Sequence, residues 1–123
     1  MQHAVVGPPT VVLPETHQVN VGSNNILDCT VNGVPEVTAV YWTKEGVVIN
    51  INDNSRYTGS SVNEPSLTIT NAKSKDIGIY SCCAVNSYNN QATSCKSTML
   101  QGNHKTKFFF LIFNCCTITV KMP

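Results

Sequence analysis

The sequence predicts an all-β protein, either a two-sheet sandwich or a barrel, built from about seven to nine short strands. Three observations support this prediction. Residues typical of strands and turns dominate, with 14 Asn and 13 Thr among 123 residues, whereas helix signals are almost absent. Short runs in which apolar and polar residues alternate recur along the chain. Turn signals rich in Gly, Pro, Asn and Ser separate these runs at intervals of roughly 8 to 12 residues.

Nine segments are expected to form strands. In chain order they span residues 10–13, 18–21, 26–31, 37–44, 47–49, 56–58, 66–70, 77–85 and 92–100. The side chains expected to share the core-facing side are Leu27, Cys29 and Val31, then Val40 and Trp42, then Leu67 and Ile69, and finally Tyr80, Cys82 and Ala84. Glu45-Gly46 is a two-residue hairpin signal between two of the strands. The alternation therefore predicts one core lined by one face of each strand.

Composition limits the function classes. The chain carries 8 basic and 7 acidic residues, a formal net charge of +1, so it lacks the long-range positive field of a nucleic-acid-binding protein. The length suits one domain, and 41% apolar residues suffice for a core. Six cysteines exceed ordinary cytosolic usage. No secretory signal follows Met1, so we expect either a cytosolic protein or a piece of a longer one.

A spaced set of residues narrows the fold. Cys29 lies in one alternating segment, Trp42 lies in the middle of the next, and residues 76–82 read D-x-G-x-Y-x-C up to Cys82. With Leu67-x-Ile69 ahead of that motif, the pattern from about residue 8 to residue 100 resembles the immunoglobulin superfamily, in particular its intermediate or I-type set. The resemblance implies an immunoglobulin-like Greek-key β-sandwich of two antiparallel sheets.

The resemblance also implies roles for individual residues. Cys29 and Cys82 are expected to form a disulfide between the sheets, with Trp42 packed against it. Tyr80 matches the tyrosine corner, whose hydroxyl donates to backbone near Asp76. Further structural roles fall to Gly78, which permits a tight corner, and to Arg56, which is placed to pair with Asp76 or else to remain an independent solvated charge.

The remaining cysteines leave alternatives open. Cys83 follows Cys82 and must face away from the core. Folding the last hairpin about Asn89, where the family usually has Gly, places Cys95 opposite Cys83. A second, cross-strand disulfide is one expectation, and two exposed thiols are the other. Cys115 and Cys116 are not expected to bridge each other.

The domain is expected to span residues 8–101, after a lead-in of residues 1–7 and before a tail of residues 102–123. The tail contains the apolar hexamer 108–113, and its apolar run ends at Val120, after 13 residues. A membrane-spanning helix needs about 20. Three interpretations stay open: a truncated membrane segment, a strand that packs on the sandwich, or a non-native end of a predicted gene, which the abrupt change in composition favours.

No enzyme is expected, since the chain has no recognisable nucleophile, phosphate-binding or zinc-protease motif. No cofactor or metal is expected either, because there is no C-x-x-C and His3, His17 and His104 are scattered.

The resemblance implies an extracellular module for protein–protein binding, as in cell-adhesion molecules and receptor ectodomains. A glycan-binding domain of innate immunity and an intracellular structural domain of the giant muscle-protein kind are the alternatives. We expect a protein partner, homophilic or heterophilic, and membrane attachment only through a longer parent protein. The expected contact loop carries Asn86, Tyr88, Asn89 and Asn90, next to a loop with Asn32, Gly33 and Pro35.

Overall fold

The structure is a computed structural model that describes residues 5–53 and 55–102. Over this part of the chain it contains ten strands and three short 3₁₀ turns. The strands are β1 (Thr10–Val12), β2 (Thr16–Val19), β3 (Asn25–Leu27), β4 (Thr30–Asn32), β5 (Ala39–Lys44), β6 (Val47–Val48), β7 (Tyr57–Gly59), β8 (Leu67–Ile69), β9 (Gly78–Asn86) and β10 (Ala92–Gly102). The 3₁₀ turns are η1 (Ile51–Asp53), η2 (Ser74–Asp76) and η3 (Tyr88–Asn90).

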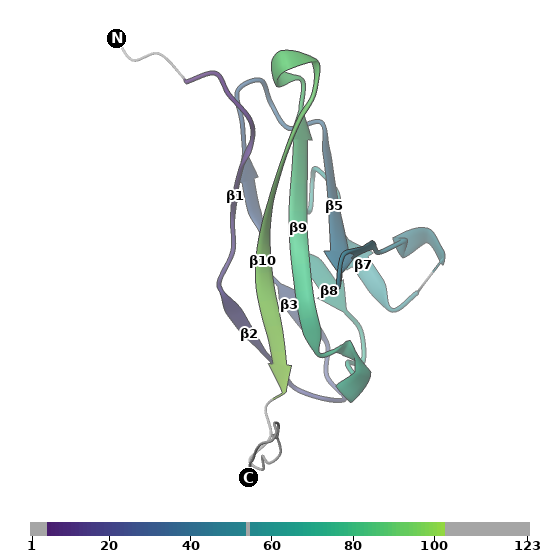
Figure 1. Ribbon diagram of the computed structural model, residues 1–123. Helices are drawn as coiled ribbons and strands as arrows, with labels where there is room; N and C mark the ends of the chain where they lie inside the picture. The colour runs from purple at the N-terminus through teal and green to yellow at the C-terminus, as the bar shows by residue number, and fades with distance from the viewer. Residues whose placement is uncertain (1–4, 54, 103–123) are drawn as a thin grey trace.

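The strands form two packed layers (Figure 1). One layer is a five-stranded sheet in the order β2-β10-β9-β5-β6. The other holds the three-stranded sheet β3-β8-β7, and the pair β1-β4 continues it because β4 follows β3 after only two residues. The expected all-β immunoglobulin-like sandwich is confirmed, with its central strands, β9 and β10, the longest.

Two details differ from the sequence expectation. The expected strand 26–31 is divided into β3, which pairs with β8, and β4, which pairs with β1. The division falls at Cys29, whose backbone N–H donates to the Ser66 hydroxyl at 2.9 Å instead of to a strand carbonyl. The sheets are also not purely antiparallel, because β2 runs parallel to β10, with His17 beside Leu100.

The core lies between the two layers and contains the side chains that the alternation pointed inward. Trp42, Leu67, Ile69, Tyr80, Cys82 and Ala84 are fully buried, and Val19, Leu27 and Leu100 join them. The indole N–H of Trp42 donates to the Pro65 carbonyl at 2.7 Å, so this buried polar atom is satisfied. Because Trp42 lies in β5 and Pro65 lies in the link before β8, this hydrogen bond connects the two layers.

Two turns adopt the backbone that their sequences predict. Glu45 and Gly46 join β5 to β6 with φ angles of 50° and 84°, the pair of positive φ values of a two-residue type I′ hairpin. Asn89, between β9 and β10, lies in the left-handed region with φ 49° and ψ 48°. Asparagine tolerates this region better than most residues, so it replaces the glycine of the family pattern at little cost.

Within the described ranges no helix is long and apolar enough to cross a membrane. Strand β10 runs through Gly102, where it pairs with Val19, and Gly7 is bonded to the loop before β5. The expectations for the tail, including Cys115 and Cys116, concern residues 103–123 and lie outside the described part.

Candidate binding surface

The Cys29–Cys82 bond, called the core disulfide below, joins the two layers. Its Cα atoms are 6.6 Å apart, and the residues are separated by 53 positions in the sequence. Cys82 lies opposite Trp42 in the register of β9 and β5, so the bond and the indole are neighbours in the core. Both cysteines are buried, so the bond links the layers through the core.

Arg56, Asp76 and Tyr80 form a connected group at one end of the sandwich. The Arg56 guanidinium donates to both carboxylate oxygens of Asp76, at 3.2 and 2.5 Å, and the Lys73 backbone N–H donates to the same carboxylate at 2.7 Å. The Tyr80 hydroxyl donates to the Asp76 carbonyl at 2.6 Å, and Arg56 also donates to the Asn71 carbonyl. The structure therefore pairs Arg56 with Asp76, and the alternative of two solvated charges does not apply.

The protonation states of this group follow from its contacts. Burial opposes ionisation of Asp76, but the hydrogen bonds from Arg56 and Lys73 outweigh it and hold the pKa of the carboxyl below its usual range. The hydrogen bond to Asp76 raises the pKa of Arg56, and burial raises the pKa of Tyr80. A charged Asp76–Arg56 pair and a neutral Tyr80 are thus the stable state, which suits a structural clamp.

Gly78 begins β9 close to the turn that joins β5 to β6. Its φ is +154°, and a Cβ atom there would lie 2.5 Å from Oε2 of Glu45. The same oxygen accepts a hydrogen bond from the Ile79 backbone N–H at 2.7 Å. A side chain at position 78 would therefore displace the Glu45 carboxylate from the start of β9.

Cys83 and Cys95 form a second bond, called the outer disulfide below, across β9 and β10. The two residues are direct partners in the register and their Cα atoms are 4.1 Å apart. Cys83 faces away from the core, yet it is only 2% exposed, because Tyr41 of β5 and its partner Cys95 flank it in the sheet. The alternative of two exposed thiols is not what the structure shows, and the cysteines it describes are all in disulfides.

The expected contact loop is only partly a surface. Asn86 is 1% exposed, and its side-chain amide donates to the carbonyls of Gly7 and Pro35 at 3.0 and 2.9 Å. Its carbonyl oxygen accepts from the Tyr88 backbone N–H. Its assignment to the binding loop is wrong, since it ties the loop before β5 to β9. Tyr88 is half-buried, and Asn89 with Asn90 is exposed at the tip.

The outer face of the five-stranded sheet is a surface that the sequence analysis did not single out. Its outward residues are Thr16 and Gln18 of β2; Thr93, Cys95, Ser97, Met99 and Gln101 of β10; Ile79, Ser81, Cys83 and Val85 of β9; Ala39, Tyr41 and Thr43 of β5; and Val48 of β6. None of these side chains is charged. The sequence signal for this face is the lack of charged residues at the outward positions of the alternating segments.

This face combines apolar and hydroxyl groups on a rigid support. Ile79 and Met99 are direct partners and are 43% and 36% exposed. Ser81 and Ser97, the next outward pair, share a hydrogen bond at 2.8 Å, and the outer disulfide lies beyond them. In the residues described, no three His, Cys, Asp or Glu side chains gather as metal ligands. These apolar and hydroxyl groups suit a contact with another protein surface.

A two-layer sandwich with an inter-layer disulfide, a tryptophan against it and a tyrosine corner defines an immunoglobulin domain. Residues 8–99 match the immunoglobulin I-set domain family, and the chain belongs to that family.

This chain spans only a small part of the length of the curated relatives that it matches. Synaptogenesis protein syg-1 of Caenorhabditis elegans is 32% identical over 97 residues, which cover 73% of this chain and 13% of syg-1. Muscle M-line assembly protein unc-89 of the same organism is 33% identical over 96 residues, 77% of this chain and 1% of unc-89. The solved Ig1-2 module of the Drosophila receptor protein tyrosine phosphatase DLAR is 29% identical with a TM-score of 0.66, and the match covers 81% of this chain and 48% of that one.

Proposed function

We propose that this domain is an extracellular recognition module that binds another protein through the outer face of its five-stranded sheet. The observation that carries the proposal is the absence of charged side chains among the outward residues of these strands, combined with the exposure of Ile79 and Met99. Charged residues are depleted at the centres of protein interfaces, and aromatic residues and methionine are enriched there. Tyr41, half-buried beside the outer disulfide, supplies the aromatic group.

The setting that we propose is a cell-surface adhesion molecule or receptor. This domain would be attached to the membrane only through a longer parent protein. Two similar proteins support this setting by name, one a synaptogenesis protein and the other a receptor protein tyrosine phosphatase. The partner is another protein, either a second copy or a different ectodomain.

The two disulfides support an extracellular location over an intracellular structural role. Similarity to unc-89, a muscle assembly protein, keeps the intracellular role as the competing hypothesis. Disulfides persist in oxidising compartments and are rare in the cytosol. Mass mapping of the protein from its natural source under non-reducing conditions decides between them, because free thiols at both disulfides would exclude the extracellular location.

The binding face is tested by placing one charge on each layer. Ile79→Lys puts a cation on the outer face of the five-stranded sheet, and Ile26→Lys is the matched control on the three-stranded sheet, where Ile26 is 52% exposed. The protein is multimerised on fluorescent beads and assayed for bead aggregation and for binding to cells that display receptor ectodomains.

We expect Ile79→Lys to weaken the interaction at least about tenfold, as loss of a central contact residue does, and Ile26→Lys to bind as the parent protein does. Equal losses in the two variants, or a loss in Ile26→Lys alone, would exclude the proposed face.

A further inference from the structure

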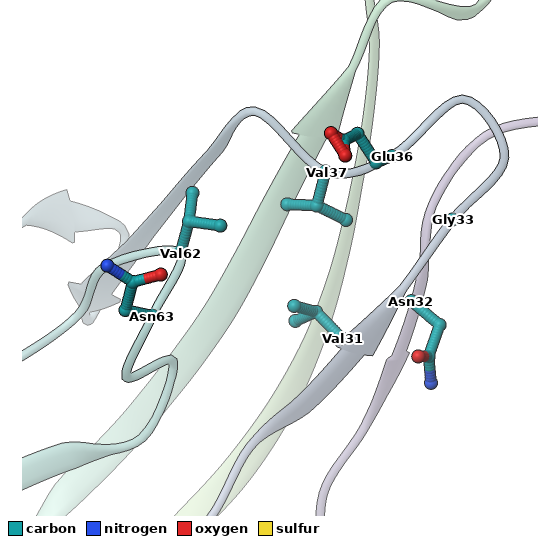
Figure 2. A pocket seen from close by; sticks show the side chains of 7 residues that line it. All are labelled: Val31, Asn32, Gly33, Glu36, Val37, Val62 and Asn63. Carbon is teal, nitrogen blue, oxygen red and sulfur yellow. The ribbon is translucent and has the colours of Figure 1, made fainter.

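A pocket of about 450 Å³ lies away from the outer face just described. It is formed where the link between β4 and β5 meets the link between β7 and β8. The residues that line it are Val31, Asn32, Gly33, Glu36, Val37, Val62 and Asn63. Figure 2 shows Val31, Val37 and Val62 around a common space, with the Glu36 carboxylate at its edge above Val37. The pocket thus has an aliphatic wall and one anionic group.

The walls of the pocket are held by hydrogen bonds that do not involve its lining side chains. On one side, the buried Asn86 amide holds the Pro35 carbonyl at 2.9 Å, and the Thr38 backbone N–H donates to the Val85 carbonyl at 2.8 Å. On the other side, the link after β7 closes on itself through Ser61 and Glu64, which exchange bonds of 3.0 and 3.1 Å. A ligand therefore meets a preformed site, which reduces the entropy lost on binding.

Glycine at position 33 is part of this construction. A Cβ atom there would lie 2.9 Å from the Pro35 carbonyl oxygen and 3.2 Å from Nδ2 of Asn86. Any larger residue would push the loop away from the amide that holds it. The wall of the pocket and the Asn86 anchor consequently depend on the same close contact.

The Glu36 carboxylate is the group that selects a ligand. Within the described ranges this carboxylate takes part in no ion pair and no hydrogen bond. The ion pair found there joins Arg56 to Asp76. An anionic ligand would be repelled by it, and a purely apolar ligand would leave a carboxylate without a partner beside it. A sugar would lack the aromatic surface on which sugar rings stack, because the lining has none.

We propose that this pocket receives an arginine side chain of a heterophilic protein partner. The aliphatic stem of arginine packs on the three valines, and its planar guanidinium donates two parallel hydrogen bonds to the Glu36 carboxylate. The amide oxygen of Asn63 at the edge can accept another of its five N–H groups. A second copy of this chain cannot supply the group, because its single arginine, Arg56, is held by Asp76.

The proposal is tested by NMR with the 123-residue chain labelled with ¹⁵N, at low salt. N-acetyl-arginine methylamide is titrated, and N-acetyl-citrulline methylamide is its uncharged counterpart of the same shape. We expect arginine to shift the backbone amides of segments 31–37 and 62–63 in a saturable way. Citrulline should bind roughly fivefold more weakly, the factor that an exposed ion pair of good geometry supplies.

Two matched variants test whether the Glu36 carboxylate causes the preference for arginine over citrulline. Glu36→Gln should remove the preference for arginine over citrulline, while Glu64→Gln, an exposed neighbour outside the lining, should keep it. Absence of shifts in these segments, equal binding of citrulline, or an equal effect of both variants would overturn the proposal. Equally tight binding of N-acetyl-lysine methylamide would overturn the choice of arginine. None of these outcomes depends on the outer face of the five-stranded sheet, so the two proposals fail separately.

Discussion

Replacement of Asp76 by asparagine should destabilise the domain by about 3 kcal/mol at neutral pH. The side chain is 2% exposed and accepts three hydrogen bonds, two from Arg56 and one from the Lys73 backbone. Removal of one partner from a buried ion pair typically costs about 3–5 kcal/mol. Arg56 remains 23% exposed and can regain some hydration, so the lower end of that range applies. This is a large part of the roughly 5–15 kcal/mol that stabilises a domain.

The effect should depend on pH with a definite sign. In the folded state the pKa of Asp76 lies below its ordinary value, so the unfolded chain binds a proton at this site more readily than the native protein. The stabilisation is therefore complete above the unfolded pKa of about 4 and is lost as the pH falls through the folded pKa. The difference between the parent protein and Asp76→Asn should be largest at neutral pH and should shrink in acid.

Urea unfolding at several pH values, with the disulfides intact, measures this difference. Trp42 is the only tryptophan and is fully buried, so its fluorescence reports loss of the core. Asp28→Asn, at an exposed carboxylate, is the control and should change stability by less than about 0.5 kcal/mol. Adding Arg56→Met completes a double-mutant cycle with an expected coupling of about 2 kcal/mol. A cost independent of pH, or a coupling near zero, would refute the assigned pair.

Three further predictions concern the supports of the sheet. Replacing Cys83 and Cys95 by serine should cost about 3 kcal/mol of stability, and replacing the core disulfide about 4 kcal/mol. The outer disulfide costs less because it closes a shorter loop, with a separation of 12 residues. Chemical unfolding of the two double mutants measures the order, and a reversed order would contradict this prediction. Tyr80→Phe should lose about 1 kcal/mol in the same assay through its buried hydrogen bond, and a neutral result would contradict that role. Gly78→Ala should destabilise the domain by about 1–3 kcal/mol. In an ¹⁵N–¹H spectrum the Ile79 amide should shift because the Glu45 carboxylate moves away from it, and an unchanged Ile79 signal would contradict this prediction.

The fold could be predicted because its determinants are local and periodic. Alternation places Trp42, Leu67 and Ile69 on inward faces whatever the order of the strands, and the spacing of Cys29 and Cys82 then restricts the topology. The expected strand 26–31 was divided in the structure because the Ser66 hydroxyl, which is 37 residues from Cys29 in the sequence, replaces a ladder partner. A contact at that separation has no periodic signature. The parallel pairing of β2 with β10 was missed for the same reason.

Asn86 shows why the binding surface was harder to predict than the core. An asparagine at the end of a strand, followed by a turn, has the sequence character of an exposed loop residue. Its burial depends on two carbonyls, of Gly7 and Pro35, that lie 79 and 51 residues away and leave a gap matched to one amide group. That amide also holds the Pro35 carbonyl beside the pocket that Glu36 lines, so we expect Asn86 to affect the proposed recognition of arginine from inside the protein. Asn86→Ala should therefore weaken arginine binding at the pocket even though position 86 cannot touch the ligand, whereas removal of the exposed Asn90 amide at the loop tip should not.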